Sequence, residues 1–117
     1  MNYLQKNQEN KRLRNLFTRA YPEGCVKITG NVSSKHEITK ASVCYYLKKE
    51  GYEIWTEATV GRARPDIIAI KGPHAYIIEI LYSESKAKFE SKRNYYPEGF
   101  TLIPVDAKTF KYEDFCL

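Results

Sequence analysis

Two short apolar runs, each carrying one acidic residue, constrain the fold of this chain more than any other feature. The first run, 66–70, opens with Asp66, and the second, 75–82, contains Glu79. Between them, residues 71–74 read Lys-Gly-Pro-His, which is typical of a turn because Gly and Pro interrupt strands. The chain is therefore expected to fold back and to bring two carboxylates together. Carboxylates inside hydrophobic strands are costly unless something compensates them, and a divalent cation is one such partner.

Length and charge describe a small basic protein. The chain has 117 residues, enough for one packed domain, and 43% of them are hydrophobic. The formal net charge is +5, and the first twenty residues hold five basic residues against one acidic residue. Such a segment suits phosphate groups, but for charge alone a solvated helix face is the better explanation. The three cysteines form no CxxC or Cys/His cluster, so we expect buried free thiols rather than a zinc site or disulfides.

Hydropathy gives no sign of a membrane protein. No apolar stretch is long enough to span a bilayer, and the polar N-terminus lacks the apolar region of a signal peptide. We therefore expect a cytoplasmic protein with no membrane partner.

Periodicity and turn signals predict an N-terminal helix and a short strand, followed by a helix, three strands, a helix and a further strand. Helices are expected at 2–20, 35–50 and 83–95, and strands at 25–32, 53–60, 66–70, 75–82 and 100–105. A hairpin-connected meander followed by a helix and another strand indicates an α/β fold with a mixed sheet flanked by helices. Because strand side chains alternate, Glu79 and Leu81 are expected on one face with Ala75 and Ile77.

The order Pro65-Asp66, apolar hairpin, Glu79 resembles the motif of the PD-(D/E)xK nuclease superfamily, which includes restriction enzymes and archaeal Holliday-junction resolvases. The motif continues from the second acid as acid-x-Lys, and the predicted element order matches the superfamily's αβββαβ core. The resemblance covers about 34–105 of a single nuclease-like domain, 1–117, and leaves 1–32 as a basic N-terminal extension. The sequence departs from the motif at the lysine position, which holds Leu81.

The resemblance implies a metal-dependent DNA endonuclease in which Asp66 and Glu79 hold Mg²⁺ or Mn²⁺ at the scissile phosphate. Many superfamily members carry a third acid on the first core helix, and Glu37 occupies that place here. A capping box that begins at Ser34 explains Glu37 equally well. The plain alternatives are a turn carboxylate for Asp66 and an edge-strand residue for Glu79.

Leu81 cannot hold a proton, a phosphate or a water, so either another cation reaches the site or catalysis is weak or lost. The lysines placed to replace it are Lys40, Lys86, Lys88 and Lys92. Lys88 is assigned to the catalytic role, although an exposed helix charge is the more common state of any single lysine. Glu57 is a reserve ligand, and His36 and His74 are expected at the surface.

Phosphate contacts are expected from arginines outside the acid pair. Arg12, Arg14 and Arg19 lie in the N-terminal segment, and Arg62 and Arg64 precede the Pro-Asp pair. A basic loop without a ligand explains Arg62 and Arg64 almost as well. A core of this size leaves little room for base-reading insertions, so the resemblance implies a structure-selective enzyme acting on DNA as a homodimer. The alternative is a nuclease fold that has lost its lysine and serves as a nucleic-acid-binding module or a protein-interaction subunit.

Overall fold

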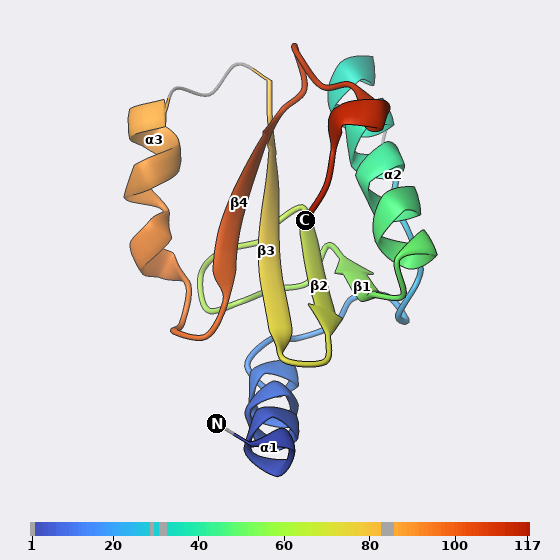
Figure 1. Ribbon diagram of the computed structural model, residues 1–117. Coiled ribbons are helices and arrows are strands. Elements are labelled where there is room, and N and C mark those ends of the chain that lie inside the picture. The colour runs from blue at the N-terminus through green and yellow to red at the C-terminus, as the bar shows by residue number, and fades with distance from the viewer. Residues whose placement is uncertain (1, 29, 31–32, 83–85) are drawn as a thin grey trace.

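The computed structural model describes residues 2–28, 30, 33–82 and 86–117 of the chain. They form a mixed α/β fold in which a four-stranded sheet lies between α2 and α3 (Figure 1). The elements are α1 (Tyr3–Arg14), α2 (Ser34–Lys49), β1 (Glu53–Thr56), β2 (Ile67–Lys71), β3 (His74–Leu81), α3 (Lys86–Ser91) and β4 (Thr101–Asp106). Short 3-10 helices lie at Arg93–Tyr95 and Tyr112–Asp114.

The four strands lie in the spatial order β1-β2-β3-β4. The pairs β1–β2 and β2–β3 are antiparallel, whereas β3 and β4 are parallel and are connected through α3. Because β3 has a neighbour on each side, Glu79 is not an edge-strand residue. In the β2–β3 pair Ile67 lies opposite Ile78, and one further step along this register places Asp66 opposite Glu79.

Side chains of the sheet alternate between two apolar clusters, one on each face. The cluster under α2 includes Val43, Cys44, Leu47, Ile54, Ile67, Ile78 and Ile80. The cluster on the other face includes Leu13, Phe17, Trp55, Ile68, Ala75 and Ile77. The alternation predicted for 75–82 is therefore confirmed, and it assigns Glu79 to the face of Ile77. Because Leu13 and Phe17 belong to the second cluster, the N-terminal segment packs against the sheet.

Two predicted elements are shorter in the structure. The helix expected over 2–20 ends at Arg14, because Thr18 pairs with Thr59 in an antiparallel bridge that needs extended backbone. The strand expected over 53–60 ends at Thr56, because Glu57 has a φ of 60°, in the left-handed region that interrupts a strand.

Two other predictions differ or fall partly outside the described residues. Residues 25–28 form no strand, although the Lys27 amide donates to Thr56 Oγ1 at 3.1 Å and so holds this segment beside β1. The helix expected over 83–95 begins at Lys86 and ends at Ser91, and residues 83–85 lie outside the described part of the chain. Helix α2, the hairpin strands β2 and β3, and strand β4 match their predicted ranges to within one residue at each end.

Two further expectations concern the burial of the cysteines and the presence of membrane-spanning helices. All three cysteines are free, but only Cys44 is buried, and Cys25 and Cys116 are exposed. Among the residues that the structure describes, no helix combines the length and the apolar character that a membrane crossing requires.

Candidate functional site

Asp66 lies immediately before β2, between β3 and α2. Its Oδ2 accepts the Ile80 N–H at 2.7 Å, and its Oδ1 lies 3.5 Å from His36 Nε2. Burial raises the pKa of Asp66, while the Ile80 hydrogen bond and the charges of His36 and Lys40 act in the lowering direction, and Glu57 adds to the rise. The carboxylate is therefore held in place and is costly to ionise, although its side chain keeps 20% of its exposure to solvent.

The start of α2 places its polar residues against Asp66. Ser33 is the N-cap, because its hydroxyl accepts the His36 N–H at 3.1 Å, so the capping box predicted to begin at Ser34 is wrong. His36 Nδ1 lies 3.4 Å from Glu37 Oε1, and Glu37 is buried. The expectation that His36 is a surface residue is also wrong, because its ring lies between Glu37 and Asp66.

Lys40 and Glu57 extend this group of charges. Lys40 is 2% exposed, and its Nζ donates to Glu57 Oε1 at 3.1 Å and to the Lys27 carbonyl at 3.2 Å. Glu57 Oε2 also lies 3.8 Å from Arg64 Nη1. The sequence offers Lys40 as one of four candidate lysines without favouring it, and it does not predict the left-handed backbone of Glu57. We call His36, Glu37, Lys40, Glu57 and Asp66 the Asp66 cluster.

Glu79 is buried, at 8% exposure, on the central strand β3. The Tyr96 hydroxyl donates to Glu79 Oε1 at 3.0 Å, and sequence analysis did not identify this contact. Asp66 and Glu79 thus stand opposite each other in the strand register. Asp66 contacts His36 on the α2 side, whereas Glu79 contacts Tyr96, which packs against the cluster on the other face.

The donor set limits the kind of metal site that the described residues can form. Among these residues no group of three or more His, Cys, Asp or Glu side chains is placed to hold a metal ion. A pair of carboxylates still fits Mg²⁺, which usually keeps several waters and takes only one or two carboxylates from the protein. Each member of the pair Asp66 and Glu79 also has one oxygen oriented by a donor, as ligating carboxylates commonly do. That Glu37 serves as a third ligand stays a prediction.

Position 81 and Lys88 lie on different elements. Leu81 is half-buried at the end of β3, opposite Asp106 of β4. Lys88 is exposed on α3. Its assignment to the catalytic role stays a prediction.

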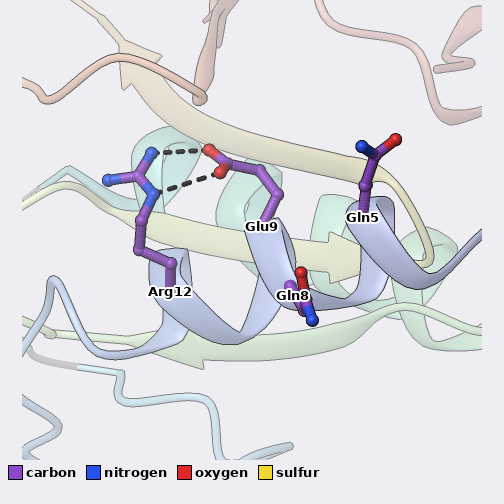
Figure 2. Close-up of a pocket in the computed structure, with 4 residues that line it drawn as sticks. All are labelled: Gln5, Gln8, Glu9 and Arg12. Carbon is purple, nitrogen blue, oxygen red and sulfur yellow. Dashed lines mark hydrogen bonds and ion pairs between the residues drawn. The ribbon is translucent and has the colours of Figure 1, made fainter. Parts of the chain in front are cut away.

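The arginines of the N-terminal helix have carboxylate partners. Arg12 Nε donates to Glu9 Oε2 at 3.1 Å, and both side chains line a shallow pocket on α1 with Gln5 and Gln8 (Figure 2). The hydrogen bond with Arg12 lowers the pKa of Glu9. Arg14 pairs with Glu53 at the start of β1.

A second group of arginines lies where the N-terminal segment meets the loop 57–64. Thr18 of the N-terminal segment pairs with Thr59 of this loop in an antiparallel bridge. Arg19, which follows Thr18, is therefore close to the loop. Arg62 and Arg64 are exposed on that loop. The Arg19 guanidinium lies over two rings of the second apolar cluster, 4.8 Å from the centroid of Phe17 and 5.1 Å from that of Trp55.

Comparison of the chain with protein families, with curated proteins and with solved structures found no match. The arrangement itself combines the half-buried Asp66, just before β2, with the buried Glu79 of β3, an ion pair between the buried Lys40 and Glu57, and exposed arginines on the loop 57–64. These groups have the chemistry to bind a divalent cation and a phosphate next to each other.

Proposed function

We propose that this protein is a metal-dependent endonuclease with a restriction-endonuclease-like core, which hydrolyses phosphodiester bonds in DNA. The observation that carries the proposal is the register of β2 and β3, which pairs Ile67 with Ile78 and, continued by one residue beyond β2, sets Asp66 opposite Glu79. The order α2-β1-β2-β3-α3-β4, with β3 and β4 parallel, supports the same core.

In this proposal Asp66 and Glu79 are the protein ligands of the metal. Mg²⁺ or Mn²⁺ bound there would polarise the scissile phosphate and lower the pKa of the attacking water. The Ile80 amide and the Tyr96 hydroxyl each hold one oxygen of a carboxylate and so fix the direction of the other oxygen. The raised pKa of Asp66 fits this role, because a cation offsets the cost of ionising a buried carboxylate.

The DNA backbone would lie along the exposed arginines. Arg62 and Arg64 are on the loop that leads into Pro65 and Asp66, so a phosphate bound there would be close to the carboxylates along the chain. Arg19 is held near this loop and is exposed. These three side chains are therefore expected to contribute more to DNA binding than Arg12 and Arg14. Arg12 and Arg14 each lie 2.5 Å from a carboxylate oxygen, whereas Arg64 lies 3.8 Å from Glu57.

One observation favours a second function, which is binding of nucleic acid without cleavage. Leu81 is apolar and half-buried where the resembled nucleases carry a lysine. A protein that had lost this charge would keep the arginines and the fold, and would still bind phosphates.

Incubating the protein with branched, single-stranded and duplex DNA, in Mg²⁺, Mn²⁺ or EDTA, tests the proposal. Cleavage that depends on the metal and stops in EDTA is expected, with branched DNA cut fastest. Retained binding without cleavage would instead support the second function, and neither binding nor cleavage would contradict both. Light scattering on the same samples tests the predicted homodimer.

A further inference from the structure

Lys40 is a cation that the fold buries completely. It is 2% exposed, and Glu57 and the Lys27 carbonyl each lie within 3.2 Å of its Nζ. A buried ammonium group is costly even when it is paired, and an apolar side chain of similar volume is often at least as stable in such a place. The stability of the fold therefore gives no reason for a charge at this position.

The position of Lys40 relates it to Asp66. His36 precedes Lys40 by one helical turn, so both side chains leave α2 on the same side, and His36 reaches Asp66 Oδ1 at 3.5 Å. The positive charge of Lys40 also lowers the pKa of Asp66, against the effect of burial. One side of α2 thus carries both the residue that reaches Asp66 and the residue that pairs with Glu57.

Glu57 holds Lys40 in this position at a cost to the backbone. It is the single non-glycine residue with positive φ in the described part of the chain, at 60°. Such a conformation persists only where the surroundings enforce it, and it is commonly found at functional sites. Its two carboxylate oxygens face Lys40 and Arg64, so this one residue pairs with two cations.

From this geometry we infer that Lys40 supplies the positive charge that Leu81 cannot supply, and that it stabilises the negative charge on the phosphate during cleavage. This inference rests on the proposed function. In the hydrolysis a water oxygen bonds to phosphorus while one phosphorus–ester oxygen bond breaks, the water loses a proton and the leaving oxygen gains one. Lys40 acts as a fixed charge and transfers no proton.

A pair of variants separates this role from that of a structural ion pair. Lys40→Met removes the cation and Glu57→Gln keeps it, yet both remove the same ion pair. We expect Lys40→Met to lower kcat by about 100-fold or more, as the loss of one preorganised donor to a developing charge does, and Glu57→Gln to lower it by less than about tenfold. Lys48→Met is the matched control, because Lys48 is on the same helix and pairs with the exposed Glu23.

The double variant Lys40→Met/Glu57→Gln separates loss of the cation from loss of the fold, because it leaves neither member of the ion pair charged and unpaired. It is expected to fold, as circular dichroism would show, and to be as inactive as Lys40→Met. Equal losses of kcat in the two single variants, or full activity in the double variant, would overturn the inference and leave the proposed function intact.

A readout without turnover comes from calorimetric titration with Mn²⁺. Removing a nearby positive charge strengthens binding of a cation, so Lys40→Met should bind Mn²⁺ several-fold more tightly than wild type. An unchanged dissociation constant would contradict the inference. A wild-type protein that neither binds Mn²⁺ nor cuts DNA would contradict the proposed function and the inference together.

Discussion

The Asp66 cluster and helix α1 both carry many charges, but water reaches them to very different extents. Lys40 is 2% exposed, whereas the Arg12 side chain on α1 is 51% exposed. Exposed ion pairs such as Arg12 with Glu9 contribute little to stability and carry little cost. Buried charges are costly to keep, and they are concentrated where sites need shifted pKa values. The burial of a charge is therefore a better guide to a site here than the density of charge along the sequence.

Replacing the acid at the centre of the buried cluster is expected to have the largest effect. Asp66→Asn keeps an oxygen to accept the Ile80 N–H but removes the charge that would bind a metal. Metal-dependent DNA cleavage should fall by more than about 100-fold, the upper range for loss of a group that only supports a metal ligand. Asp106→Asn is the matched control, because Asp106 is an exposed acid at the end of the neighbouring strand β4. Equal activity of the two variants would remove Asp66 from the site.

The two groups of arginines are predicted to differ in the salt dependence of DNA binding. Arg19, Arg62 and Arg64 changed to Gln together should reduce the slope of log K against log salt by about 2.7, since each phosphate contact on duplex DNA contributes about 0.9. Arg12→Gln with Arg14→Gln should change the slope less, because both residues lie 2.5 Å from a carboxylate oxygen, closer than the 3.8 Å between Arg64 and Glu57. A larger change in the slope from Arg12→Gln with Arg14→Gln would contradict this prediction and would make the N-terminal helix the main phosphate contact.

A lysine at position 81 is predicted to restore part of the activity that Lys40→Met loses. Leu81 shares the face of Glu79, so Leu81→Lys would return a cation near Glu79, and a gain of about tenfold over Lys40→Met alone is expected. The new charge is half-buried, so thermal unfolding must show equal folded fractions before rates are compared. No gain at equal folded fraction would show that the two positions do not serve one site.

The smallest expected effect is on stability, and its sign depends on pH. Folding raises the pKa of Asp66 above its ordinary value of 3.8, mainly through burial. The folded state therefore binds more protons than the unfolded state, and the stability that Asp66 contributes below pH 3.8 is lost as pH rises through the folded pKa. Asp66→Asn should be more stable than wild type at pH 7 and should lose this advantage as pH approaches 3.5. Urea unfolding of both proteins at pH 7 and pH 3.5 measures this difference in the free energy of unfolding. A difference that does not depend on pH would contradict the prediction.

Much of the fold could be predicted from the sequence because local signals were strong. Gly51 ends the helix that precedes β1, with a φ of 90°, and the turn at 71–74 sets the β2–β3 hairpin. The early end of β1 could not be predicted, because the cause is the positive φ of Glu57, a residue that normally avoids it. The end of α1 at Arg14 likewise depends on the bridge between Thr18 and Thr59, which are far apart in sequence.

The candidate site was predicted less completely than the fold. Asp66 and Glu79 could be paired from the hairpin alone, because strand register follows from the turn and the apolar pattern. His36 could not be assigned to Asp66, nor Tyr96 to Glu79, because these contacts connect separate elements. The same holds for the contact of Lys40 with Glu57. Periodicity indicates which side of α2 faces the sheet, but it does not indicate that buried polar groups lie there.

The central claim is that Asp66 and Glu79 hold a divalent metal, and paramagnetic broadening by Mn²⁺ tests it most directly. Substoichiometric Mn²⁺ added to ¹⁵N-labelled protein should first broaden the backbone amide signals of Asp66, Glu79 and Ile80. The signals of Gln5 and Arg12 on α1 should stay sharp, and Asp66→Asn should abolish the broadening at Ile80. Broadening centred on Glu9, or spread without preference along the chain, would contradict the account.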